Sequence, residues 1–213
     1  MIKPGELTVF VIDDDEAVRR SLCWLIESTD HRAVGFSSAD EFLNEPAFKG
    51  SGCIVSDVRM SGTSGIALLQ ELQTRRNDLP VVVITAHGDV QMAVEAMKLG
   101  AFDFVEKPFE EKALLEVIER ALDESETHHR ESSNDAIIRA RFDNLTPREH
   151  EVLDLIVAGN PNRSVAETLG ISEKTVEAHR AHIMEKTKAM SFADLVSKTV
   201  RIGAAKTRDD GSI

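Results

Sequence analysis

Short apolar runs alternate with helical patterns through the first 125 residues, and this alternation constrains the fold more than any other feature. The runs are four to six residues long and rich in β-branched or aromatic residues, as strands are: 7–12, 32–36, 53–56, 81–85 and 103–107. The helical patterns lie between and after them, at 16–28, 38–44, 64–76, 90–99 and 110–123. Five strands alternating with five helices predict a doubly wound α/β domain, with a five-stranded parallel sheet covered on both faces.

Polar residues end four of the five predicted strands. The first strand runs into Asp13, Asp14 and Asp15, the third ends at Asp57, the fourth at Thr85 and the fifth at Lys107. Each has a structural explanation when taken alone, since an acidic cluster can start a helix and an aspartate can cap a turn. In a doubly wound sheet, however, the carboxyl ends of the strands meet at the edge where ligands bind. The coincidence favours a reaction centre.

This combination of groups suits the transfer of a phosphoryl group to an aspartate. Crowded carboxylates repel one another unless a cation lies among them, and hard oxygen ligands select Mg²⁺, which bridges carboxylate and phosphate. A carboxylate nucleophile beside the metal, with an ammonium and a hydroxyl to hold the incoming oxygens, is the equipment for phosphoryl transfer. We therefore expect Asp57 to be a nucleophile rather than a turn cap.

The sequence around these positions resembles the receiver domain of two-component response regulators. The matching blocks are VFVIDDDEAVRRSL, SDVRM and ITAHGDVQMAVEAMKLGAFDFVEKPF, and the last is close to FixJ-type regulators. The resemblance implies a flavodoxin-like fold in which Asp57 is the phosphoacceptor. It also implies that Asp14, Asp57 and the backbone carbonyl of Arg59 ligate Mg²⁺, and that Asp13 acts mainly through water.

The same resemblance assigns the residues that respond to phosphorylation. Thr85 receives a phosphoryl oxygen, Lys107 pairs with the phosphoryl charge, and Phe104 is the switch aromatic. The Lys107–Pro108 peptide bond is expected to be cis. The candidate dimerisation face consists of three residues of the fourth helix, although packing against the sheet must claim some of them: Val90, Val94 and Met97.

Composition indicates a second domain with a different charge balance. The chain has 213 residues, 42% of them hydrophobic, which favours two packed domains. Residues 1–125 hold 12 Lys and Arg against 23 Asp and Glu, whereas residues 143–213 hold 10 against 11. Most of the net charge of −12 thus lies in the first part, and the second can approach a polyanion. We predict a receiver at 1–124, a polar linker at 125–142 that can continue the preceding helix, and a small all-α domain at 143–208.

The C-terminal part has the pattern of a helix-turn-helix protein. Thr146, Pro147 and Glu149 predict a capped helix that ends at Gly159. A short helix, a turn at 169–171 and a second helix capped by Ser172 follow, and then a final amphipathic helix. On the second helix, one side is predicted to pack and the other to carry small residues that allow close approach to a DNA groove. The packing side holds Val176, Arg180, Ile183 and Thr187, and the exposed side is centred on Ala178 and Ala181. Alanines are also good surface helix formers, so the pattern alone does not require DNA.

The blocks LTPREHEVL, GNPNRSVAETLGISEKTVEAHRAHIMEK and SFADLV resemble the LuxR-type DNA-binding domain of NarL and FixJ regulators. The resemblance makes the second helix the recognition helix and promoter DNA the ligand. The candidate DNA contacts are Asn162, Arg163, Lys174, Thr175, Glu177, Ala178, Arg180, Ala181, His182 and Lys186.

Two positions depart from these family patterns. Where the loop after the acceptor usually reads Met-Pro-Gly, this chain has Met60-Ser61-Gly62, so the Arg59 carbonyl is expected to be less firmly presented to the metal. Thr187 stands on the packing side where the family often has Leu, and its hydroxyl needs a backbone partner to avoid a cost of roughly 1–3 kcal/mol.

Together these features predict a phosphorylation-activated transcription regulator, not an enzyme. A histidine kinase would phosphorylate Asp57, the receivers would form a homodimer, and the paired domains would bind promoter DNA; RNA polymerase is a candidate partner. The alternatives are a Mg²⁺-dependent phosphatase that turns over at Asp57, and a constitutive DNA-binding protein whose receiver is a scaffold. The first needs an acid/base carboxylate where Arg59 stands, and the second needs none of the receiver residues. No apolar run approaches the roughly 20 residues of a membrane helix and the N-terminus lacks signal-peptide features, so we expect a soluble, cytoplasmic protein without membrane contact.

Overall fold

The computed structural model describes residues 7–45, 50–75, 77–85 and 90–204, and the chain divides into two compact units at residues 130 and 131. The predicted domain limits at residues 1 and 208 lie outside the described residues. Within the described ranges, no helix is both long enough and apolar enough to cross a membrane.

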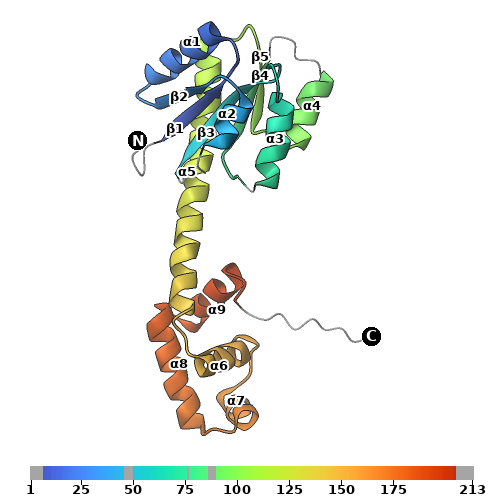
Figure 1. Ribbon diagram of the computed structural model, residues 1–213. Coiled ribbons are helices and arrows are strands. Elements are labelled where there is room, and N and C mark those ends of the chain that lie inside the picture. The colour runs from blue at the N-terminus through green and yellow to red at the C-terminus, as the bar shows by residue number, and fades with distance from the viewer. Residues whose placement is uncertain (1–6, 46–49, 76, 86–89, 205–213) are drawn as a thin grey trace. The chain divides into compact units, whose positions relative to one another are not determined.

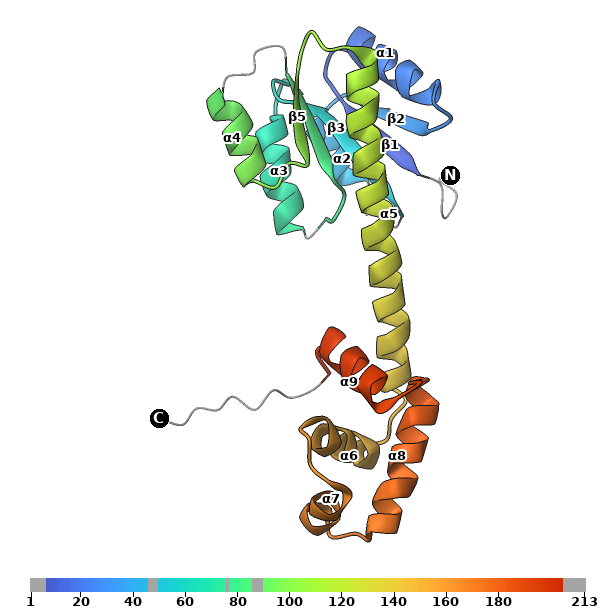
Figure 2. The same cartoon turned by 180° about the vertical axis from the view of Figure 1, so that it is seen from behind.

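The first unit contains the predicted parallel sheet of five strands (Figures 1 and 2). The strands are β1 (Thr8–Ile12), β2 (Arg32–Phe36), β3 (Gly52–Asp57), β4 (Val81–Thr85) and β5 (Asp103–Glu106). Their order across the sheet is β2-β1-β3-β4-β5, and all four pairings are parallel. This is the flavodoxin-like order, which reverses direction between β1 and β3, so a ligand site is expected outside their carboxyl ends.

Helices cover both faces of this sheet and define two cores. They are α1 (Glu16–Glu27), α2 (Ala39–Asn44), α3 (Gly65–Thr74), α4 (Val90–Lys98) and α5 (Glu111–Phe142). Buried residues of α1 and α5, such as Ile26 and Ile118, pack against one face. Residues of α2, α3 and α4, such as Phe42 and Leu68, pack against the other. The central strands β1, β3 and β4 are continuous apolar runs because both of their faces are buried, whereas the edge strands β2 and β5 are partly exposed.

Helix α5 has 32 residues and includes the whole stretch 125–142 that was predicted as a linker. Leu114, Ile118 and Leu122 belong to a core of the first unit. From residue 123 to 137 most side chains are exposed, and then Ile138 and Phe142 enter the core of the second unit.

The second unit is helical, as its capping signals predict. Its helices after α5 are α6 (Pro147–Val157), α7 (Asn162–Leu169), α8 (Glu173–Thr187) and α9 (Phe192–Arg201). Thr146 and Glu149 form the predicted capping box of α6, and Ser172 caps α8. Gly170 has a left-handed backbone, with φ of 65°, in the turn between α7 and α8. The α7–turn–α8 segment is the predicted helix-turn-helix.

Candidate functional site

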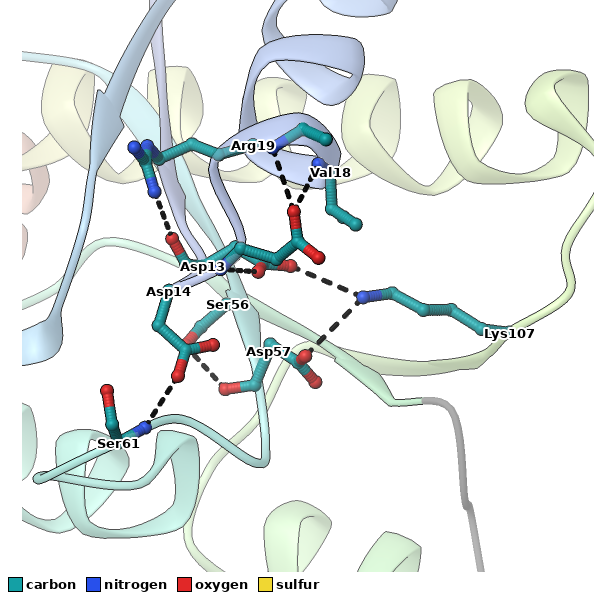
Figure 3. Close-up of polar contacts among 10 residues, drawn as sticks. Asp13, Asp14, Val18, Arg19, Ser56, Asp57, Ser61 and Lys107 are labelled. Atoms are coloured by element: carbon teal, nitrogen blue, oxygen red, sulfur yellow. Dashed lines mark hydrogen bonds and ion pairs between the residues drawn. The ribbon is translucent and has the colours of Figure 1, made fainter.

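Three charged side chains meet at the carboxyl edge of the sheet (Figure 3). Lys107 Nζ lies 3.3 Å from Asp13 Oδ2 and 3.4 Å from Asp57 Oδ2. Asp13 follows β1, Asp57 ends β3 and Lys107 follows β5, so the sheet order brings together residues that are far apart in sequence. The N–H of Lys107 also donates to the carbonyl oxygen of Thr85 over 2.7 Å, which ties the end of β5 to the end of β4. The Lys107–Pro108 peptide bond is cis.

The buried carboxylate oxygens of this cluster differ in their hydrogen bonding. Asp57 Oδ1 is buried without a hydrogen-bond partner among the residues described. Asp13 is 2% exposed, and burial raises the pKa of its carboxyl group against the opposing effects of the Asp15 N–H and Lys107. A buried oxygen that lacks a donor suits a cation or a bond to phosphorus, because an unpaired buried acceptor is costly.

The neighbouring Asp14 is held by the loop after β3. Asp14 Oδ2 accepts a hydrogen bond of 2.8 Å from the N–H of Ser61 (Figure 3), and this bond is the main reason why the pKa of the exposed Asp14 carboxyl is lowered. In the described part of the chain, no three His, Cys, Asp or Glu side chains are placed to hold a metal together. Mg²⁺ usually keeps several waters and needs only one or two carboxylates. The chemistry of these carboxylates therefore fits a hydrated Mg²⁺.

Arg19 is a member of this site that we did not predict from the sequence. Its guanidinium donates to the backbone carbonyl oxygen of Asp13 over 2.7 Å (Figure 3). Asp15, in the same loop, caps the N-terminus of α1. The available signal was Gly35 inside β2, because a strand glycine often marks a close approach. A Cβ at Gly35 would lie 3.1 Å from Arg19 Cγ, so the glycine leaves room for the arginine stem.

The predicted switch and dimerisation residues lie on β4, β5 and α4. Thr85 is fully buried, and Phe104 is half-buried against the core that α4 also covers. Val94 is 45% exposed and Met97 is 50% exposed, so neither side chain is buried by packing against the sheet. The side chain of Val90 lies outside the described residues.

Helix α8 has the two faces that its sequence predicts. Val176, Ile183 and Thr187 are buried, whereas Ala178 and Ala181 are exposed. Other candidate DNA contacts are also exposed: Lys174, Thr175, Glu177 and His182 on α8, and Arg163 on α7, where it pairs with Glu167; Asn162 is half-buried.

Two basic residues of α8 have partners within the unit. Lys186 Nζ lies 2.7 Å from Oε2 of Glu149, which is only 3% exposed, and the Arg180 guanidinium stacks 5.1 Å from the centre of the Phe192 ring. Burial raises the pKa of Glu149, but hydrogen bonds from Lys186 and Thr146 outweigh it and bring the pKa to about 2.

The hydroxyl of Thr187 also has the backbone partner that it was predicted to need. It donates to the Ile183 carbonyl oxygen over 2.7 Å, so its burial leaves no unsatisfied group.

A receiver-like sheet edge with an aspartate, a lysine and two further carboxylates, joined in one chain to a helix-turn-helix, defines a response regulator. Comparison with known families agrees: residues 9–119 match the response regulator receiver domain, and residues 143–199 match the bacterial regulatory proteins of the luxR family. The chain belongs to the response regulators that combine these two domains, and it is a phosphorylation-activated transcription regulator.

Similarity to full-length relatives extends over nearly the whole chain. It is 44% identical over 206 residues to the transcriptional regulatory protein FixJ of Azorhizobium caulinodans, which covers 97% of this chain and 98% of that protein. The structure of the response regulator StyR is similar with a TM-score of 0.82 and 41% identity, covering 92% of this chain and all of that one. The full-length FixJ structure from B. japonicum gives a TM-score of 0.57 and 40% identity, covering 95% of this chain and all of that one. These relatives do not favour a phosphatase or a constitutive DNA-binding protein.

Proposed function

We propose that Asp57 is the phosphoacceptor of this response regulator and that a histidine kinase is its phosphodonor. The observation that supports this most is the buried Oδ1 of Asp57 beside Lys107, which has no hydrogen-bond partner within the described ranges of the chain. A carboxylate oxygen of Asp57 attacks phosphorus, forming a P–O bond as the P–N bond to the kinase histidine breaks. Lys107 already lies between Asp13 and Asp57, so it can follow the new negative charge without leaving the site.

The remaining predicted residues complete this centre. The Thr85 hydroxyl would hold a phosphoryl oxygen, and Phe104 would follow Thr85 into a second packing. Mg²⁺, held by Asp14, Asp57 and the Arg59 carbonyl and by Asp13 through water, would offset the negative charge of the phosphoryl group. Arg59 occupies the position two residues after Asp57 where a phosphatase of the predicted alternative needs an acid/base carboxylate. We therefore propose a receiver that stores one phosphoryl group and does not turn over as an enzyme.

Phosphorylation would then lead to binding of promoter DNA in the cytoplasm. Receivers would pair through the α4–β5 face, and two helix-turn-helix units would bind adjacent half-sites. The exposed alanines of α8 support this role for its outer face, because small side chains allow a helix to enter a major groove. Lys186 and Arg180, engaged with Glu149 and Phe192, would brace the recognition helix more than contact phosphates.

Intact-mass measurement after incubation with acetyl phosphate tests the acceptor. Wild type should gain one phosphoryl group in the presence of MgCl₂ and none after chelation with EDTA. Asp57→Asn should gain none, whereas Asp30→Asn, which changes an exposed aspartate in a turn, should behave as wild type. Equal incorporation by wild type and Asp57→Asn would reject the assignment.

A further inference from the structure

A backbone hydrogen bond joins the loop after β3 to the loop after β1. The N–H of Ser61 donates to Asp14 Oδ2 over 2.8 Å, although the two residues are 47 positions apart (Figure 3). This bond depends on the residue by which the chain departs from the receiver pattern. A proline at position 61 has no N–H, so a chain with the usual Met-Pro-Gly could not form it.

Both ends of the bond lie at ligands of the proposed metal site. Asp14 supplies one carboxylate, and the Arg59 carbonyl lies two residues before Ser61. A carboxylate has about four lone-pair positions, so one N–H can fix its orientation and still leave capacity for a cation. Carboxylates that ligate metals are commonly held by such outer hydrogen bonds.

We propose that Ser61 is a positioning residue for Mg²⁺ in this protein: its N–H holds the Asp14 carboxylate and the Arg59–Ser61 loop in the arrangement that receives the cation. The inference rests on the proposed Mg²⁺-dependent function of the site. The sequence predicted a loosely presented Arg59 carbonyl because proline is missing. The hydrogen bond supplies a restraint of another kind, from the loop to the metal ligand itself.

The hydrogen bond and a proline would affect Mg²⁺ affinity by different amounts, so the sign of the effect of Ser61→Pro can be predicted. Removing a hydrogen bond that orients a metal ligand typically lowers metal affinity about 10- to 100-fold. Introducing proline at a compatible position restricts the chain and gains about two- to fivefold in an equilibrium constant. The loss is larger than the gain, so Ser61→Pro should weaken Mg²⁺ binding by about tenfold even though it introduces the residue that is usual in receivers.

Titration of ¹⁵N-labelled full-length protein with MgCl₂, followed by NMR of the amides near Asp57, tests this without any activity measurement. Ser61→Ala is the conservative variant, because it keeps the N–H that binds Asp14 and removes only the hydroxyl, whose hydrogen bond to Asp14 is the weaker of the two. It should bind Mg²⁺ within about threefold of wild type, while Ser61→Pro should bind about tenfold more weakly. Ser61→Pro binding as tightly as wild type, or more tightly, would overturn the proposal. Absence of Mg²⁺-dependent shifts in wild type would instead reject the proposed metal site on which it rests.

Hydrogen exchange of the Ser61 amide gives a second measurement if Ser61→Pro does not fold. In metal-free wild type this exposed amide should be protected by Asp14, and in Asp14→Ala it should exchange about tenfold faster. Equal exchange rates in the two proteins would show that Asp14 does not hold the loop, and would overturn the proposal independently of Mg²⁺.

Discussion

At the scale of single residues, Gly65 fixes the distance between the end of β3 and the start of α3. Its N–H donates to the Val58 carbonyl oxygen, and an added Cβ would lie 2.4 Å from the carbonyl oxygen of Asp57. A backbone atom so close cannot be avoided by a side-chain rotation, so Gly65→Ala must shift the strand end that carries the proposed phosphoacceptor.

We predict that Gly65→Ala slows phosphorylation by acetyl phosphate by about tenfold to a hundredfold, because a displacement of about 1 Å at a reacting group costs that much. Rates from intact-mass time courses check this, with far-UV circular dichroism to confirm folding. Phosphorylation at the wild-type rate in the folded variant would show that the strand end accommodates the methyl group without moving Asp57.

Glu149 is a second residue whose effect can be measured, because its ionisation changes the stability of the second unit. Its folded-state pKa of about 2 is below the ordinary value of 4.5. The ionised form is therefore the one that folding favours, and its contribution is present above pH 4.5 and lost as the pH falls from 4.5 towards 2.

Glu149→Gln should lower the unfolding free energy of this unit by about 2 kcal/mol at pH 7. At pH 3 the difference in unfolding free energy between the variant and wild type should be smaller. Urea titrations of the full chain, followed through NMR signals of residues 143–202, measure both values. Glu151→Gln, which changes an exposed glutamate on the same helix, is the control and should stay near wild type. A deficit for Glu149→Gln that is equally large at both pH values would contradict the ion-pair explanation.

The sequence predicted which side chains gather at the site, but it did not predict all of the hydrogen bonds and ion pairs that they form. Asp13, Asp57 and Lys107 could be placed together because parallel strands end at one edge, a rule that needs only strand order. The Ser61 N–H and the Arg19 guanidinium could not be placed, because their partners depend on loop geometry and on a side-chain path over Gly35. Lys186 was predicted at the DNA from its charge, and its partner Glu149 is 37 residues away in the sequence.

At the scale of elements, the spacing of apolar residues predicted the strands and helices because the strand pattern and the helix pattern differ strongly in this sequence. The central strands are short apolar runs buried on both faces, and helices such as α6 have apolar positions three or four apart with clear caps. The length of α5 was harder to predict, since residues 123–137 lack an apolar face. Pairs such as Arg130 with Glu126, four residues apart, help a helix of this composition to continue.

The outer face of α8 gives a prediction that separates specific binding to the operator from electrostatic binding to any DNA. Ala178→Leu and Ala181→Leu should each weaken binding to a selected operator by tenfold or more, at least about 1.4 kcal/mol, because added bulk keeps the helix out of the major groove. Lys174→Ala should weaken operator and random DNA alike and reduce the salt dependence by about one counterion.

Fluorescence anisotropy at several salt concentrations distinguishes these effects. Ala140→Leu, the same substitution at an exposed alanine of α5, is the control for added surface bulk and should bind as wild type. Normal operator binding by both α8 leucine variants would mean that this face does not enter the groove.

At the scale of the whole molecule, charge makes pairing of chains important. The acidic residues lie mostly in the first 125 residues, and the DNA-binding part is close to neutral, so one copy should bind DNA weakly. Two linked copies gain effective concentration, which can raise avidity by roughly 10²–10⁴ without new contacts. Under the proposed function, phosphorylation of the first unit would therefore control DNA binding by the second through dimerisation.

Thr85 and Met97 test the two halves of this coupling. Thr85 is buried at the sheet edge and Met97 is exposed on α4, so Thr85→Ala should impair the signal and Met97→Glu should impair the pairing surface. Both variants should still take up one phosphoryl group from acetyl phosphate, yet sediment mainly as monomers and bind the operator about a hundredfold more weakly than phosphorylated wild type. Trp24→Glu is the matched control, because Trp24 is an exposed apolar residue of α1, which covers the opposite face of the sheet. It should dimerise as wild type does.

If phosphorylated Met97→Glu dimerises as well as wild type, the pairing surface does not include α4. If phosphorylated Thr85→Ala dimerises as well as wild type, the phosphoryl group must affect the pairing surface through residues other than Thr85.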